Sequence, residues 1–114
     1  MRTLTISLLH VPLLLLCGLS QAADMSSEEK AATQQLAKDS GCLSCHALTE
    51  KVVGPAYSSV AEKYSGQSDA AASLVQSIQY GSKGKWGRIP MPAHASLSSE
   101  DLNKLARWVL TIQK

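Results

Sequence analysis

Apolar positions after the first 22 residues recur every three or four residues, which is the spacing of amphipathic helices. The segments with this spacing are residues 26–38, 56–64, 69–80 and 98–112. No run of alternating β-branched and polar residues, which would predict a strand, occurs after residue 22. The pattern therefore predicts an all-α domain of three to four short helices.

Residues that begin and end helices stand at the borders of these segments. Ser26 with Glu29 forms a capping box, and Ser98 with Asp101 caps the last helix. Each of the first three segments is followed by a glycine that can stop it, namely Gly41, Gly66 and Gly81. The segment 81–97 is rich in Gly and Pro and has no periodicity, so we expect a long ordered loop. In a small domain such a loop usually has a function.

Residues 1–22 have the features of a secretory signal peptide. A nearly unbroken apolar run from Leu4 to Leu19 ends in a short polar stretch that closes with Ala22. The run is short for a membrane-spanning helix and contains a proline. Cys17 raises the alternative of lipidation, but the residue before it is not small, as lipoprotein signals require. We therefore predict a single domain, residues 23–114, exported to the periplasm.

The composition makes this domain short of core-forming side chains. Only 4% of the chain is aromatic and Phe is absent. A domain of this size buries little more than half of the surface that its unfolded chain exposes, and it is marginally stable unless a cross-link or cofactor completes the core. The length excludes a multidomain enzyme, and the formal net charge of +2 excludes nucleic-acid binding that rests on bulk basicity.

The sequence Gly41-Cys42-Leu43-Ser44-Cys45-His46 is a C-x-x-C-H motif, which is typical of c-type haem attachment. Thiols three positions apart lie on one side of a helical turn, where each can add to a vinyl group of the porphyrin, and His46 follows as the proximal iron ligand. A structural zinc site would need further ligands, for which only His94 remains. A thioredoxin-like pair would need a βαβ unit, and a plain disulfide would leave His46 without a role.

Three side chains of residues 23–114 are candidates for the second axial position: Met25, Met91 and His94. Met25 is expected at a frayed N-terminus. Met91 stands between two prolines, Pro90 and Pro92, which stiffen the loop where the thioether is presented. His94 is the rival ligand. His/Met ligation raises the potential and leaves no open coordination site, so it predicts electron transfer rather than bond chemistry.

Two further groups are expected near the iron. A backbone carbonyl of the Gly54-Pro55 pair can accept a hydrogen bond from the second nitrogen of His46 and so fix the imidazole tautomer. Trp86 lies in the polar Gly-rich loop, and its indole N–H needs a partner, for which a haem propionate is a candidate.

Four stretches, GCLSCHAL, VGPAYSSVAEKYSG, GSKGKWGRIPMP and LARWVL, resemble in sequence and order the small monohaem class I cytochromes c of bacteria, of the five-fifty-one and five-fifty-two type. The resemblance implies helices wrapped around one covalent haem c, with the N- and C-terminal helices crossing. It also implies His46 and Met91 as axial ligands, a Pro55 carbonyl bonded to His46, and Trp86 near a propionate.

The chain departs from the family pattern at positions near the expected haem. Relatives commonly have Pro and Asn where this chain has Ala93 and His94, and the missing Asn amide can bond to the ligand sulfur. A basic residue of the third helix that can reach a propionate is replaced by Ser77.

The expected function is that of a monomeric periplasmic shuttle that carries one electron from a membrane-bound respiratory donor to a terminal reductase, with nitrite reductase favoured, or to an oxidase. Its docking surface would have an apolar centre of Val52, Val53, Pro55, Ala56, Ile89, Pro92 and Ala93, and a basic rim of Lys38, Lys51, Lys83, Lys85 and Arg88. The alternatives are a small haem enzyme or ligand sensor with a labile sixth ligand, and an electron-entry subunit of a dehydrogenase.

Overall fold

The computed structural model describes residues 24–114, so the predicted signal peptide and Cys17 lie outside the described residues. The described chain forms α1 (Ser27–Asp39), the 3-10 turn η1 (Cys42–Ser44), α2 (Tyr57–Tyr64), α3 (Ala70–Tyr80) and α4 (Ser99–Leu110). It contains no strand, which confirms the all-α prediction. No helix within residues 24–114 has the length and apolar character needed to cross a bilayer.

Helix starts follow the capping residues in the sequence. The Ser26 hydroxyl accepts from the Glu29 amide at 3.1 Å, while the Glu29 carboxylate accepts from the Ser26 amide at 2.8 Å. The Ser98 hydroxyl accepts from the Asp101 amide at 3.1 Å. The predicted start of the second helix is one residue too early, because Ala56 is the N-cap of α2, whereas Asp69 is the N-cap of α3, as its place at the start of the segment 69–80 allows.

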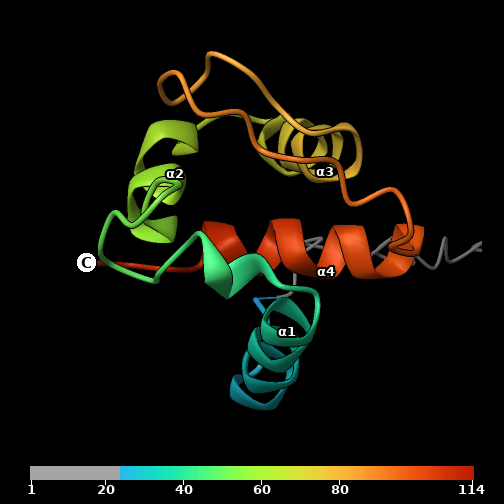
Figure 1. Ribbon diagram of the computed structural model, residues 1–114. Coiled ribbons are helices and arrows are strands. Elements are labelled where there is room, and N and C mark those ends of the chain that lie inside the picture. Colours follow the sequence, from blue (N-terminus) through green and yellow to red (C-terminus); the bar gives the residue numbers. More distant parts are fainter. Residues whose placement is uncertain (1–23) are drawn as a thin grey trace, which may run out of the picture.

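α4 is the central element of the fold. Its apolar face packs against α1, α2 and α3, and the side chains of Leu102, Leu105 and Trp108 are at most 2% exposed. Figure 1 shows α1 crossing α4 on one side, with α2 and α3 on the other. The predicted crossing of the N- and C-terminal helices is therefore confirmed.

Met25 does not lie at a frayed end, as the sequence suggested. It is 7% exposed and belongs to the same cluster of buried residues as Trp108, so that prediction is wrong. The residue directly precedes the Ser26 cap of α1, and the apolar contact holds the start of this helix against the core.

The segment between α3 and α4 crosses the molecule opposite α1 (Figure 1). One antiparallel bridge, which the sequence did not predict, closes it at its base: Ser82 donates to the Met91 carbonyl at 3.1 Å, and Met91 donates to the Ser82 carbonyl at 2.8 Å. The His94 amide donates to the Ile78 carbonyl of α3 at 2.9 Å. Both the amide and the carbonyl group of Met91 are therefore hydrogen-bonded, which fixes its backbone.

Candidate functional site

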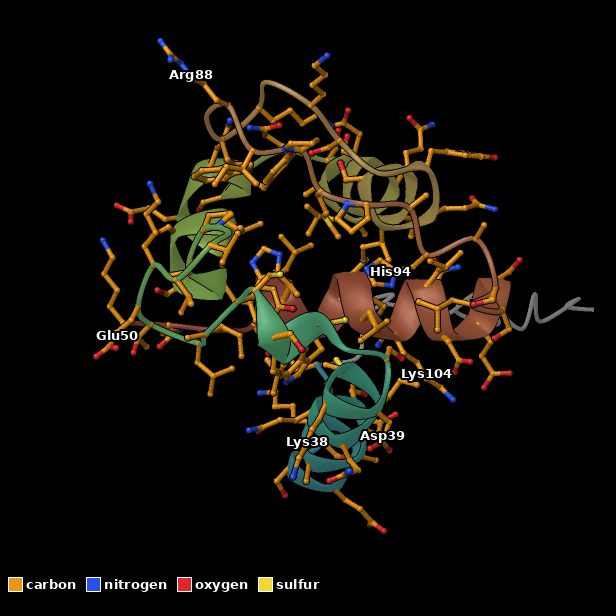
Figure 2. All side chains as sticks on the ribbon, viewed as in Figure 1. Lys38, Asp39, Glu50, Arg88, His94 and Lys104 are labelled. Carbon is orange, nitrogen blue, oxygen red and sulfur yellow. The ribbon has the colours of Figure 1, made fainter. Side chains whose placement is uncertain are left out.

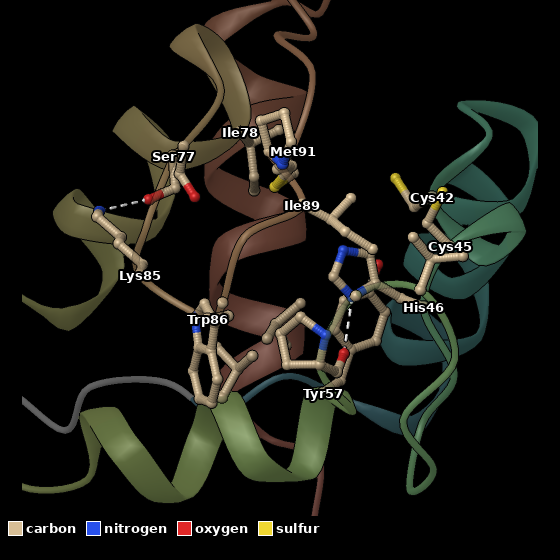
Figure 3. A pocket seen from close by; sticks show the side chains of 18 of the residues that line it. Cys42, Cys45, His46, Tyr57, Ser77, Ile78, Lys85, Trp86, Ile89 and Met91 are labelled. Atoms are coloured by element: carbon tan, nitrogen blue, oxygen red, sulfur yellow. Dashed lines mark hydrogen bonds between the residues drawn. The ribbon is translucent and has the colours of Figure 1, made fainter.

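A cavity of about 360 Å³ lies between α2, α3, α4, the C-x-x-C-H turn and the long loop. Its wall is mainly apolar, and it includes the predicted residues Cys42, Cys45, His46, Pro55, Trp86 and Met91. Figure 3 shows the cysteines and His46 on one side of this pocket and Trp86 on the other. The structure thus brings all six predicted site residues to one cavity.

Backbone contacts fix the orientation of the His46 imidazole. Nδ1 lies 2.7 Å from the Pro55 carbonyl oxygen, which can only accept, so Nδ1 carries the proton and donates it. Nε2 is therefore left with a free lone pair, as an iron ligand requires. Gly54 contributes by having no side chain, since a Cβ there would lie 2.5 Å from His46 Cε1.

Two aromatic rings continue from His46 into the core. Tyr57 of α2 stacks on the imidazole with ring centroids 4.9 Å apart and an angle of 18° between the planes, and Trp108 meets Tyr57 edge-on at 5.4 Å. Burial raises the pKa of Tyr57, so its ring stays neutral at physiological pH. Trp108 was not among the residues predicted from the sequence, although it lies beside Leu105 and Ile112 on the periodic face of the last helix.

Cys42 and Cys45 lie on the turn that follows Gly41, and they form no disulfide with each other. Gly41 has φ of 78°, a left-handed conformation that lets the chain leave α1 sharply and enter η1. Cys42 is 8% exposed, and burial raises the pKa of its thiol. The sulfurs of Cys42 and Cys45 lie on the same side of the pocket (Figure 3), as attachment to one edge of a flat group would require.

Of the three candidates for the second axial ligand, only Met91 lines the cavity. Met25 is part of the core under α1. His94 is half-buried, its amide is bonded to the Ile78 carbonyl of α3, and it is absent from the cavity wall, so the structure gives no support to it as a rival ligand.

The donor set suits an iron porphyrin better than a bare metal ion. The cavity offers two neighbouring thiols, one imidazole nitrogen and one thioether, and no Asp or Glu lines it. Within residues 24–114, no group of three or more His, Cys, Asp or Glu could hold a metal ion, which argues against the zinc alternative. The residues present therefore fit a large apolar group with two reactive vinyls, two open axial positions and a negative charge.

The predicted docking surface needs two corrections. Lys38 lies on α1, on the other side of α4 from the cavity, and so does not belong to the basic rim (Figure 2). Ala56 is only 4% exposed, so it cannot belong to an apolar surface. By contrast, Val52, Val53 and Ile89 are 56%, 45% and 68% exposed, and all three line the mouth of the cavity.

Comparisons with known proteins agree with this site. A family model described as cytochrome c matches residues 31–113. Cytochrome c-551 of Pseudomonas aeruginosa is 51% identical over 76 residues, which cover 67% of this chain and 72% of that protein. Cytochrome c-552 of Hydrogenobacter thermophilus is 45% identical over 82 residues, which cover 72% of this chain and 83% of that protein.

Among solved structures, that of wild-type cytochrome c552 from Nitrosomonas europaea is similar, with a TM-score of 0.68 and 45% identity. The match covers 70% of this chain and 99% of that one. The chain therefore belongs to the cytochrome c family, and its cofactor is one covalently attached haem c, which contains iron.

Proposed function

We propose that this protein is a periplasmic carrier of single electrons, with Cys42 and Cys45 as the thioether attachments and His46 and Met91 as the axial ligands. The observation that carries the proposal is that one cavity contains all four side chains. When bound, the haem supplies a one-electron iron couple. The protein holds the imidazole through Pro55, excludes water with an apolar wall, and leaves one edge of the cavity open toward a partner.

The rigidity of the Met91 backbone favours the carrier over a haem enzyme or ligand sensor. A labile sixth ligand requires a loop that can move away, whereas both backbone polar groups of Met91 are bonded to Ser82. A fixed thioether leaves no coordination position for a substrate.

Replacement of the proposed ligand separates these two functions. We expect Met91→Ala to abolish the ferric sulfur-to-iron charge-transfer band and to make the ferric protein bind cyanide rapidly, because a coordination position opens. His94→Ala is the matched control, since His94 lies outside the cavity, and it should keep the band. Absorption spectra and stopped-flow cyanide binding make the measurement. A wild-type ferric spectrum that is already high-spin would contradict the carrier.

The open edge of the cavity is suited to brief contact with redox proteins. Exposed apolar side chains of Val52, Val53 and Ile89 are accompanied there by the cations Lys51, Lys85 and Arg88, and no carboxylate lines the cavity. We propose that a membrane-bound respiratory donor and a terminal reductase, nitrite reductase first, or an oxidase use this edge in turn, and that the protein works as a monomer. The predicted signal peptide supports the periplasmic location.

Electrostatic steering makes a prediction for the kinetics. The rate constant for electron transfer with an acidic partner should fall several-fold between about 10 mM and 500 mM salt, because the Debye length shrinks from about 30 Å to a few Å. Stopped-flow traces at increasing ionic strength measure it. Lys104→Gln, which removes a charge from α4 away from the cavity, should leave the slope unchanged, whereas a rate that ignores salt would remove the steering role.

A further inference from the structure

The wall of the cavity opposite the thiols carries a second group of polar side chains. Ser77 of α3 and Lys85 and Trp86 of the loop line the cavity. Figure 3 shows these three residues across the pocket from Cys42, Cys45 and His46. A partner was expected from the sequence only for the indole N–H of Trp86, namely a haem propionate. Ser77 and Lys85 have no such partner yet.

A short chain of hydrogen bonds holds the Lys85 ammonium at this wall. Lys85 Nζ lies 2.8 Å from Ser77 Oγ, and the Ser77 hydroxyl lies 3.1 Å from the Ser73 carbonyl oxygen. The serine has one hydrogen, which goes to the carbonyl, so it can only accept from the ammonium. Two of the three ammonium hydrogens remain, and within residues 24–114 no carboxylate pairs with Lys85.

Contacts from α2 fix the same part of the loop from the other side. Lys63 Nζ lies 4.4 Å from the centroid of the Trp86 ring and donates to the Lys85 carbonyl at 3.3 Å. Trp86 is half-buried, and its indole N–H has no hydrogen-bond acceptor in the described part of the chain. Two lysines thus hold the segment around Trp86 between α2 and α3, with unused donors left at the cavity wall.

The chemistry of the porphyrin decides what these donors face. Its vinyl groups and its two carboxylate side chains lie on opposite edges of the ring, so a haem whose vinyls meet Cys42 and Cys45 directs its carboxylates to the opposite wall. A carboxylate in that position can form charge-assisted hydrogen bonds with an ammonium held there, and these are stronger than hydrogen bonds between neutral groups.

We propose that Lys85, positioned by Ser77, is the cation that pairs with a haem carboxylate. This inference rests on the proposed haem attachment through Cys42 and Cys45. In relatives, a basic residue of the third helix can reach a haem carboxylate, but this chain has Ser77 there. The proposal gives that role to the loop residue Lys85. Of the other cations near the cavity, Lys63 lies over Trp86, Arg88 extends outward (Figure 2), and Lys51 belongs to the segment between η1 and α2.

The test compares two charge removals in the same loop. Lys85→Gln and Lys83→Gln each delete one positive charge from an exposed lysine, but only Lys85 lines the cavity. For each holoprotein, a redox titration gives the midpoint potential, and proton NMR of the ferric form gives the shifts of the methylene groups that carry the haem carboxylates.

We expect Lys85→Gln to lower the potential clearly more than Lys83→Gln and to move the carboxylate methylene signals, because a paired carboxylate no longer has its charge neutralised beside the iron. Lys85→Arg should restore both readouts. Ser77→Ala should give a smaller change of the same sign, since it removes only the acceptor that positions the ammonium.

Two results would overturn the proposal. The first is that the two Gln variants have equal midpoint potentials and unmoved methylene signals. The second is that Lys85→Gln changes only the salt dependence of electron transfer, which would make Lys85 a docking residue only. Failure of the proposed function is recognised separately, because it would appear in the wild-type spectrum as a missing sulfur-to-iron band.

Discussion

Haem-free protein in which Cys42 and Cys45 are both replaced by alanine will show no cooperative unfolding transition. The cavity of about 360 Å³ lies among the helices that form the core. Without haem, the apolar side chains that line it, among them Val60, Leu74 and Val109, face water, and each side chain of this kind contributes about 1.5 to 3 kcal/mol when it is buried. Domains of this length have a net stability of about 5 to 15 kcal/mol and stand near the lower limit, so the loss of these contributions removes most or all of it.

Differential scanning calorimetry and near-UV circular dichroism of the haem-free double variant make the measurement. The wild-type holoprotein is the control, and it should give one sharp heat-absorption peak. A single sharp peak from the haem-free variant would show that Leu102, Leu105, Trp108 and their neighbours close the core without the porphyrin.

Gly81→Ala will destabilise the holoprotein by at least about 3 kcal/mol and weaken the proposed bond between Met91 and the iron. Gly81 has φ of 77° and ψ of 175°, a region that costs a residue with a side chain about 1 to 3 kcal/mol. In addition, its Cβ would lie 2.5 Å from the Met91 carbonyl oxygen and 3.1 Å from the Ala93 amide nitrogen. These are backbone atoms, so the loop that presents Met91 must shift.

Gly84 provides a matched control for this prediction. It lies in the same loop with φ of 75°, but nothing lies within 4 Å of a Cβ built there. Gly84→Ala should therefore cost only about 1 to 2 kcal/mol of backbone strain and keep the sulfur-to-iron band. Guanidinium unfolding and ferric absorption spectra separate the two variants. An intact band in Gly81→Ala would show that the close approach to Met91 does not hold the ligand.

The helices could be predicted from the sequence because their signals are local. Capping residues such as Ser26 and Ser98 fix helix starts within a few positions, and spacing identifies the buried face of α4. The C-x-x-C-H motif is equally local, and so is the carbonyl that follows His46. Each of these features depends on residues within about ten positions of one another.

Features that join distant segments could not be predicted in this way. The bridge between Ser82 and Met91 and the contacts of Lys63 and Lys85 depend on how the loop lies over α2 and α3. Met25 gave a wrong expectation for the same reason, because its burial comes from packing on a helix about eighty positions away rather than from its neighbours. Ala56 was grouped with Val52 and Val53 in the predicted docking surface, but only the two valines are exposed.

The central place of α4 also sets the order in which this chain can fold. α1, α2 and α3 pack on a helix that follows all of them in the sequence, and only α1 and η1 make a close local pair. Contacts at such long range form late, after the loops between them close. Until residues 99–110 are in place, Leu105 and Val109 do not close the cavity, and the turn with Cys42 and Cys45 stays open to an incoming cofactor.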